Sequence, residues 1–282
     1  MIKGIDVSNH QVRIDWTRAA TDGVAFAYIK ATEGVGFVDP KMGAFAEGAG
    51  NAKIPFGFYH FGRPDTHSGT SQSDVIGDAQ AEADFFLSVA FPRKGQLVPV
   101  LDLEVGGLAP RLMVTWAKAW LARVEERAQV TPILYTYPAF WSQMGNSSAF
   151  TSFRLWIASY GVAAPHLPDG WKTYTIWQYA TGSVPGIPGA VDLNQLGAGV
   201  TLAQITVKPP PPPPPPPVQN LPGPVPKPDW FWLWVRWRQG VGEFAELQQH
   251  PDVRPDEVPE RIPQWAWQSL TKLSTKPKPP PA

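Results

Sequence analysis

The chain has 282 residues, enough for one large hydrophobic core and an appended segment. It carries 24 basic and 24 acidic residues, so its composition gives no sign of a nucleic acid or another polyanionic partner. It contains no cysteine, which excludes disulfides and thiolate metal sites. Residues 1–7 lead directly into a predicted strand, so we expect no signal peptide, and no apolar run approaches the ~20 residues that cross a membrane.

Short apolar segments alternate with stretches of helical spacing over the first part of the chain. Asp15 is placed to cap a short helix, and Met113, Trp116, Trp120 and Val124 recur at helical spacing. The loops that join the last three strands predict an irregular β/α barrel. The predicted helices cover residues 15–20, 40–51, 70–89 and the region around 113–124, and the predicted strands cover residues 1–7, 24–30, 54–61, 96–105, 132–136, 154–160, 174–180 and 190–193.

A proline-rich stretch over residues 208–228 separates the predicted barrel, residues 1–207, from a C-terminal unit. Nine consecutive prolines, residues 209–217, favour a semi-rigid polyproline II spacer of roughly 28 Å. Residues 229–282 are rich in tryptophan and predict two or three short helices. This small helical unit is interpreted either as a cell-surface-binding module or as a cap that packs on itself.

Two carboxylates, Asp102 and Glu104, lie near the end of the apolar stretch of residues 96–105. Side chains alternate along a strand, so both acids face one side, with Cβ atoms ~6–7 Å apart. Asp6 and Asp192 likewise stand alone on one face of short apolar segments. Buried carboxylates are costly unless they are hydrogen-bonded or needed for chemistry. A closed parallel barrel would bring all four acids together at the strand ends, which predicts a site.

Aromatic and charged residues at other predicted strand ends have competing interpretations. Tyr59, Tyr135 and Trp177 are placed either to contact a sugar or to belong to the core. Lys30 and Glu33 are interpreted as structural ion-pair partners rather than as catalysts.

Histidines near the first and third predicted strands raise the question of a metal site. His10 and His60, with Asp6, are potential ligands, but they lack the close spacing that is typical of zinc-binding motifs. We therefore expect neither a metal nor a cofactor.

Eight short motifs in register resemble the strand ends of the family 25 glycoside hydrolases, the Chalaropsis-type lysozymes of phage endolysins and bacterial autolysins. The resemblance covers residues 1–205 and leaves the C-terminal unit outside. His10 departs from it, because tyrosine often holds this loop position in the family. The motifs are GIDVS (residues 4–8), YIKATEG (28–34), GFYHF (57–61), LDLE (101–104), ILYT (133–136), LWIA (155–158), WQY (177–179) and VDLN (191–194).

The resemblance implies N-acetylmuramidase activity, that is, cleavage of the β-1,4 bond between N-acetylmuramic acid and N-acetylglucosamine in peptidoglycan. By position, Glu104 resembles the general acid, and Asp102 resembles the carboxylate that stabilises the oxocarbenium-like charge or orients the 2-acetamido group. Asp6 and Asp192 match two further acids on the groove floor. A Cβ spacing of ~6–7 Å does not decide between a retaining and an inverting pair. The candidate substrate-binding residues are Tyr59, Tyr135, Trp177 and Gln178.

Two other functions remain open at this point: a non-catalytic glycan-binding barrel, and another barrel glycosidase such as a chitinase or glucosaminidase. The expected partner is the glycan strand of peptidoglycan, with the protein acting as a monomer and without membrane contact by the C-terminal unit. The resemblance and the expected lack of a signal peptide favour a phage endolysin. Such a protein is made in the host cytoplasm and acts on the wall after release.

Overall fold

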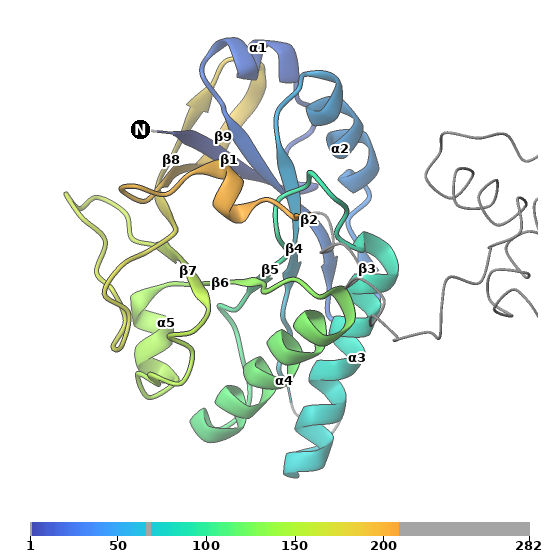
Figure 1. The fold of residues 1–282 in the computed structure, drawn as a ribbon, viewed down its shortest axis with the longest axis vertical. Coiled ribbons are helices and arrows are strands. Elements are labelled where there is room, and N and C mark those ends of the chain that lie inside the picture. Colours follow the sequence, from blue (N-terminus) through green and yellow to red (C-terminus); the bar gives the residue numbers. More distant parts are fainter. Residues whose placement is uncertain (1, 66–68, 209–282) are drawn as a thin grey trace, which may run out of the picture. The chain divides into compact units, whose positions relative to one another are not determined.

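The computed structural model describes residues 2–65 and 69–208. These residues form a closed barrel of eight strands, with a short additional strand, β3, paired to β2 (Figure 1). The order around the barrel is β1-β9-β8-β7-β6-β5-β4-β2, and pairing of β1 with β2 closes it. The predicted irregular β/α barrel is confirmed. The strands are β1 Lys3–Val7, β2 Phe26–Glu33, β3 Phe37–Val38, β4 Phe56–Phe61, β5 Val100–Asp102, β6 Ile133–Thr136, β7 Arg154–Ala158, β8 Ile176–Val184 and β9 Ile187–Leu196.

The expectation that every barrel strand is parallel is wrong for β9. This strand runs antiparallel to both of its neighbours, β1 and β8. Only Pro185 and Gly186 separate the end of β8 from the start of β9, and Gly186 has a positive φ of 97°. A parallel connection requires a crossover of a dozen or more residues, so a two-residue turn imposes an antiparallel hairpin.

Helices α1 and α3 begin where the sequence supplies capping groups. The Asp15 carboxylate accepts a hydrogen bond from the Arg18 N–H at the start of α1, as predicted. Ser71 and Asp74 form a reciprocal capping box at the start of α3. Helices α3 and α4 pack side by side outside the barrel (Figure 1). The helices are α1 Trp16–Thr21, α2 Met42–Asn51, α3 Gln72–Ala90, α4 Pro110–Ala128, α5 Pro138–Gln143 and the 3-10 helix η1 Leu202–Ile205.

Two short elements, β3 and α5, were not predicted. Strand β3 has two residues and pairs with the end of β2 across a turn that contains Gly34, whose φ is +53°. Helix α5 has six residues and begins at Pro138, a residue that favours the first helical position. Neither element is long enough to produce a periodic pattern of apolar residues.

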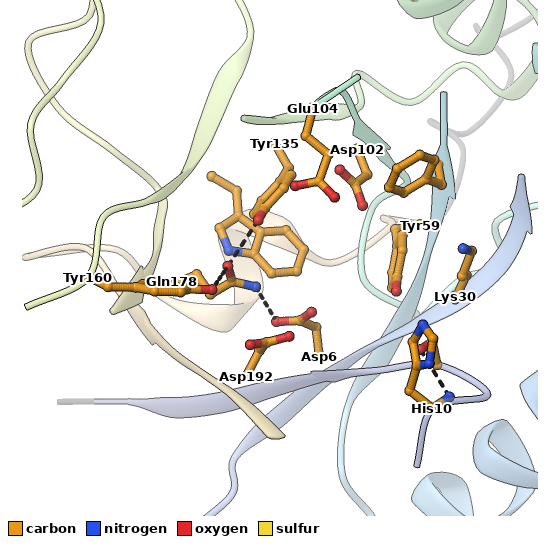
Figure 2. Close-up of a pocket in the computed structure, with 13 residues that line it drawn as sticks. Asp6, His10, Lys30, Tyr59, Asp102, Glu104, Tyr135, Tyr160, Gln178 and Asp192 are labelled. Atoms are coloured by element: carbon orange, nitrogen blue, oxygen red, sulfur yellow. Dashed lines mark hydrogen bonds between the residues drawn. The ribbon is translucent and has the colours of Figure 1, made fainter. Parts of the chain in front are cut away.

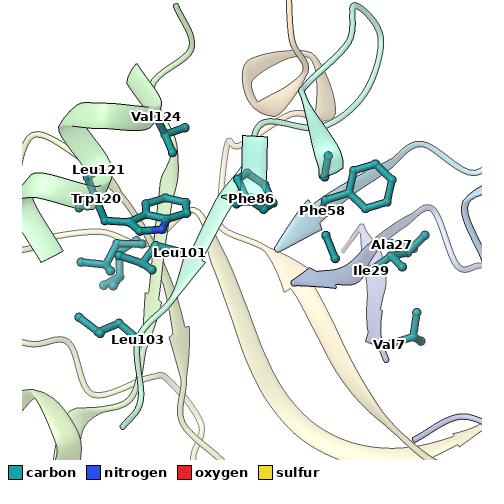
Figure 3. Close-up of a cluster of buried hydrophobic side chains, with 14 of the residues drawn as sticks. Val7, Ala27, Ile29, Phe58, Phe86, Leu101, Leu103, Trp120, Leu121 and Val124 are labelled. Atoms are coloured by element: carbon teal, nitrogen blue, oxygen red, sulfur yellow. The ribbon is translucent and has the colours of Figure 1, made fainter. Parts of the chain in front are cut away.

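Side-chain alternation along the strands divides the core into two layers. On β5, Val100 points into the barrel, whereas Leu101 and, just after the strand, Leu103 point outward to the helices. The outer layer contains Trp120 and Phe86 from the helices that cover the sheet (Figure 3). The inner layer fills the barrel with the side chains of Phe26, Tyr28, Leu97, Val98, Val100, Ile133, Tyr135, Trp156, Ala158, Ile176, Leu196, Ile205 and Val207.

The last described segment of the chain closes the end of the barrel at which β5 begins. The N–H of Val98 donates to the carbonyl of Ile205, and the N–H of Val207 donates to the carbonyl of Gln96. Ile205 and Val207 are buried among the inner-layer side chains. Because this segment closes one end of the barrel, a substrate can enter only at the opposite end, where the parallel strands have their carboxyl ends.

The predicted linker, residues 208–228, lies outside the described residues except for Lys208, and the unit of residues 229–282 lies wholly outside them. The chain divides into two units, Met1–Pro211 and Pro212–Ala282. Among the helices that the structure describes, none combines the length and the apolar character needed to cross a lipid bilayer.

Candidate active site

A pocket of about 310 Å³ opens at the carboxyl ends of the parallel strands, and its lining is mostly polar. All four acids singled out in the sequence line it (Figure 2). They reach it from different strands because each sits at an inward-facing position of the alternating pattern. Asp6 and Asp192 are direct partners in the β1–β9 ladder, Asp102 ends β5, and Glu104 follows two residues later. The predicted convergence of the four carboxylates is thus present in the structure.

Asp6 is the most firmly held of the four acids. Its Oδ2 accepts hydrogen bonds from Gln178 Nε2 at 2.8 Å and from Asn194 Nδ2 at 2.7 Å. The Asn194 amide is fixed in turn, because its Oδ1 accepts a bond from Trp156 Nε1. Burial and the nearby Asp192 carboxylate raise the pKa of Asp6 to about 7, although the two amide bonds oppose the rise. Asp6 therefore holds its proton over a wide range of acidic pH.

Asp102 and Glu104 share the opposite side of the pocket (Figure 2). Burial is the main cause that raises the pKa of Asp102 well above its usual value, followed by the charges of Glu104 and Asp6. Asp102 Oδ1 has no hydrogen-bond partner in residues 2–65 and 69–208. The pKa of Glu104 is also raised, first by burial and then by Asp192. Four carboxyl groups that raise one another's proton affinity cannot all be ionised near neutral pH.

A second chain of hydrogen bonds links the tyrosines to this cluster. Tyr135 Oη and Tyr160 Oη both donate to Gln178 Oε1, at 2.9 and 2.5 Å. Burial raises the pKa of Asp192, although the neighbouring Tyr160 hydroxyl opposes the rise. Gln178 Oε1 therefore accepts hydrogen bonds from two tyrosines, and Gln178 Nε2 donates one to Asp6. This fixes its amide orientation.

Three of the four predicted substrate-binding residues, Tyr59, Tyr135 and Gln178, line the pocket. Trp177 does not, because it neighbours the inward-facing Gln178 on β8 and points to the outer layer instead. Its Nε1 donates to the Ser159 carbonyl at 2.8 Å, and its side chain is buried. The structure thus favours the core interpretation of Trp177 over sugar contact.

Several pocket residues were not singled out from the sequence as glycan contacts. Trp156 is inward-facing in a strand motif, so strand alternation could have identified it. Tyr160 follows β7 in a loop, where no periodicity points to it. The other lining residues that sequence reasoning did not assign to substrate are Ser8, His10, Lys30 and Phe61.

The residues considered as metal ligands are not brought together. His10 lines the pocket, whereas His60 points outward, where its Nε2 lies 2.7 Å from Glu82 Oε2 and its Nδ1 lies 2.8 Å from Thr32 Oγ1. Burial lowers the pKa of His60 to about 3, and it raises that of Glu82 to about 8. Within the described residues, no group of three or more His, Cys, Asp or Glu side chains is arranged to hold a metal ion.

The expected ion pair between Lys30 and Glu33 is present, with Lys30 Nζ 2.5 Å from Glu33 Oε2. Arg63, at the end of β4, also pairs with Glu33. Lys30 lines the pocket, and Glu33 and Arg63 are connected to it through these ion pairs.

A barrel that opens on clustered carboxyl groups with raised pKa values is typical of enzymes that hydrolyse glycosidic bonds. Comparison with known proteins agrees. The sequence profile of the Glycosyl hydrolases family 25 matches residues 5–187. The chain is 38% identical over 207 residues to Lysozyme M1 of Streptomyces globisporus, which covers 69% of this chain and 67% of that protein.

Solved structures give the same result. The crystal structure of the lysozyme from Streptomyces coelicolor superposes with a TM-score of 0.64 and 35% identity, covering 72% of this chain and 94% of that one. The CTP1L endolysin superposes with a TM-score of 0.57 and 27% identity, covering 70% of this chain and 66% of that one. The chain belongs to glycoside hydrolase family 25 and is a glycoside hydrolase that acts on peptidoglycan.

Proposed function

We propose that the pocket hydrolyses the β-1,4 bond between N-acetylmuramic acid and N-acetylglucosamine, with Glu104 as the general acid. The observation that carries this proposal is the cluster of four carboxyl groups in one pocket, each with a raised pKa. Hydrolysis of a glycoside needs one carboxyl group that is still protonated near neutral pH, so that it can donate to the leaving-group oxygen. The burial of Glu104 and the charge of Asp192 supply this condition.

Asp102 is the proposed partner of Glu104, and in its ionised form it stabilises the positive charge that develops on the sugar ring. Burial holds the pKa of Asp102 well above the usual value. Its Oδ1 makes no hydrogen bond to any described residue. A positive charge or a polarised acetamido group beside that oxygen would lower the pKa of Asp102, so the ionised form is favoured as the bond breaks.

Asp6 and Asp192 complete the site in this proposal. Asp6 is fixed by Gln178 and Asn194, so it presents a carboxyl group of defined orientation on the pocket floor. Asp192 supports the protonated state of Glu104 by its charge. Tyr59 is partly buried, lines the pocket together with these acids, and offers a ring face against which a sugar would rest.

Analysis of the reaction products tests the activity directly. Purified peptidoglycan would be digested, reduced with borohydride and examined by mass spectrometry. We expect reduced muramic acid at the new chain ends, because a muramidase leaves this sugar at the reducing end. Reduced glucosamine ends would indicate a glucosaminidase instead, and no new ends at all would indicate a barrel that only binds glycan. Release of chitin fragments at a comparable rate would favour a chitinase.

We further propose that the protein acts as an endolysin, made in the cytoplasm of a bacterial host and reaching the wall after the membrane is permeabilised. The similarity to an endolysin structure supports this role. Expression of the chain in a bacterial host should leave the culture intact until the membrane is opened, for example with chloroform, and lysis should then follow rapidly. Lysis without permeabilisation would contradict the proposal and would instead favour an exported autolysin.

A further inference from the structure

A group of charged and aromatic side chains flanks the pocket and takes no part in the proposed hydrolysis. We name Lys30, Glu33, Phe37, Phe61 and Arg63 the cationic rim. Two of its members, Lys30 and Phe61, line the pocket itself. The cationic rim has two positive charges and one negative charge, hence a net charge of +1, beside a cluster of four carboxyl groups.

The two cations of the rim are held in place by one carboxylate and by aromatic faces. Glu33 Oε2 lies 2.5 Å from Lys30 Nζ, and Glu33 Oε1 accepts a hydrogen bond from Arg63 Nε at 2.7 Å and a second one from Arg63 Nη2. Lys30 Nζ lies 4.8 Å from the centre of the Phe61 ring and 5.5 Å from that of Phe37. The guanidinium carbon of Arg63 lies 4.8 Å from the centre of the Phe61 ring. Because these contacts already hold both side chains in place, binding of a ligand costs little further side-chain entropy.

The rim is nonetheless open to solvent. The Arg63 side chain is 49% exposed, and its Nη1 makes no hydrogen bond to any residue in the described ranges. Phe37 is 39% exposed, and Val35 and Val38 of the same hairpin are also exposed. The rim therefore combines an available guanidinium donor with an apolar surface, which suits a ligand group that is both anionic and partly aliphatic.

The rim also lies within electrostatic reach of the reacting groups. The charges of Lys30 and Arg63 both lower the pKa of Glu104, although burial and Asp192 outweigh them. An anionic substituent on a bound sugar would be repelled by the four carboxyl groups of the pocket. Lys30 is the only lysine or arginine among the described residues that line the pocket, and Arg63 is joined to it through Glu33. An anion next to the reacting sugar thus finds its counter-charge on this side.

We propose that the cationic rim is a subsite for the carboxylate-bearing 3-O-substituent of the muramoyl residue, with Arg63 binding the carboxylate and the exposed face of Phe37 contacting its aliphatic part. The inference rests on the proposed muramidase function. The carboxylate belongs either to the lactyl ether itself or to the peptide attached to it. The two carboxylates have the same chemistry but lie at different distances from the sugar ring, and three substrates distinguish between them.

The test compares three soluble glycan substrates: one with intact peptides, one stripped by an amidase so that only the lactyl carboxylate remains, and one in which that carboxylate is converted to the methylamide. The measured quantity is the preference, the ratio of kcat/KM for a charged substrate to kcat/KM for the neutral one. We expect Arg63→Gln to lower this preference roughly 3- to 10-fold, the effect of losing one partly exposed charge-assisted hydrogen bond. Arg63→Lys should retain most of it.

Arg127→Gln is the matched control, because Arg127 is also about half exposed and paired with a carboxylate, Asp84, on the outside of the barrel. It should leave the preference unchanged. The peptide is joined to the lactyl carboxyl through an amide bond, so the peptide-bearing substrate has no free lactyl carboxylate. A loss of preference for the peptide-bearing substrate alone therefore assigns the carboxylate to the peptide, and a loss for the stripped substrate alone assigns it to the lactyl group. A loss for both shows that the rim accepts either carboxylate. An equal fall on all three substrates in a folded Arg63→Gln variant, or no fall on any, would overturn the inference. Product analysis of the unmodified enzyme reports separately on the proposed function.

Discussion

At the scale of single residues, Asp192 affects chemistry through its charge. Because burial and Asp192 raise the pKa of Glu104, removal of that charge should lower it. We predict that Asp192→Asn moves the alkaline limb of the pH profile of kcat/KM to lower pH, since turnover requires a protonated Glu104. Asp22→Asn, which changes an acid paired with Lys3, is the control and should leave the limb in place. An alkaline limb that does not move in Asp192→Asn would contradict this coupling.

Asp6 shows that the site costs stability. Its folded-state pKa is about 7 against an ordinary value of 3.8, so between these pH values the unfolded chain has lost a proton that the folded chain keeps. The free energy of unfolding therefore falls as the pH rises from about 4 to about 7. Asparagine keeps an oxygen to accept the bonds from Gln178 and Asn194 but carries no charge.

We predict that Asp6→Asn is more stable than the unmodified protein at pH 8, by roughly 1–3 kcal/mol, with little difference at pH 4. The difference is limited because Asp6 and Asp192 titrate together, so Asp192 takes up part of the proton exchange. Urea denaturation at the two pH values measures the difference. A variant that is equally or less stable at pH 8 would show that burial of Asp6 carries no such cost.

At the scale of elements, helix α2 contains a glycine that packing requires. A Cβ at Gly48 would lie 2.2 Å from Trp16 Cδ1, and Trp16 is buried under α2. We predict that Gly48→Ala destabilises the protein by roughly 1–3 kcal/mol, although alanine is normally the better helix former. Gly77→Ala in α3 is the control, because nothing lies within 4 Å of its added Cβ, and it should stabilise by about 0.5–1 kcal/mol. Thermal denaturation of both variants measures the two effects. A Gly48→Ala variant that is more stable than the Gly77→Ala variant would contradict the account.

The elements that the sequence predicted well are those with a strong local signal. The apolar alternation around Asp102 predicted which side chains of β5 face the pocket, and the cap at Asp15 predicted the start of α1. The direction of β9 depends on the tight turn at Pro185 and Gly186, which the sequence analysis did not consider. Attention to the two-residue spacing would have predicted a hairpin.

Site residues in loops, or fixed by long-range contacts, were beyond local sequence signals. Tyr160 enters the pocket from a loop, and its role depends on a hydrogen bond to Gln178, 18 residues away. Arg63 is linked to Lys30 through two shared partners, the Glu33 carboxylate and the Phe61 ring. Trp177 was considered for sugar contact as an aromatic residue at a strand end, but it adjoins the inward-facing Gln178, and adjacent residues of a strand face opposite sides. Each of these placements is set by the closure of the barrel rather than by spacing along the chain.

At the scale of the whole molecule, the barrel should fold without the C-terminal unit. Residues 1–211 retain the segment around Ile205 and Val207 that closes the barrel. We predict that this fragment unfolds cooperatively and still cleaves soluble glycan. A shorter fragment that ends at Leu196 should fail to fold, because it loses buried side chains of the inner layer. A fragment of residues 1–211 that is insoluble or inactive on soluble glycan would show that the barrel depends on residues 212–282.

The same fragment tests the predicted role of residues 229–282, which lie outside the described residues. If this unit binds the wall, its removal should lower activity on intact cells far more than on soluble glycan, because a tether raises the effective substrate concentration only at a surface that it binds. Equal activity of the fragment and the full chain on both substrates would favour a unit that packs on itself.

The central claim is that Glu104 donates the proton that breaks the glycosidic bond, and its direct test is the turnover of Glu104→Gln on purified peptidoglycan. We predict a ~10²–10⁴-fold loss of kcat with an unchanged melting profile, because glutamine preserves the shape of the side chain but has no acidic proton. Glu125→Gln, on the outer surface of α4, should retain full activity as the control. More than about a tenth of the unmodified rate remaining in a correctly folded Glu104→Gln variant would contradict the role of Glu104 as the general acid.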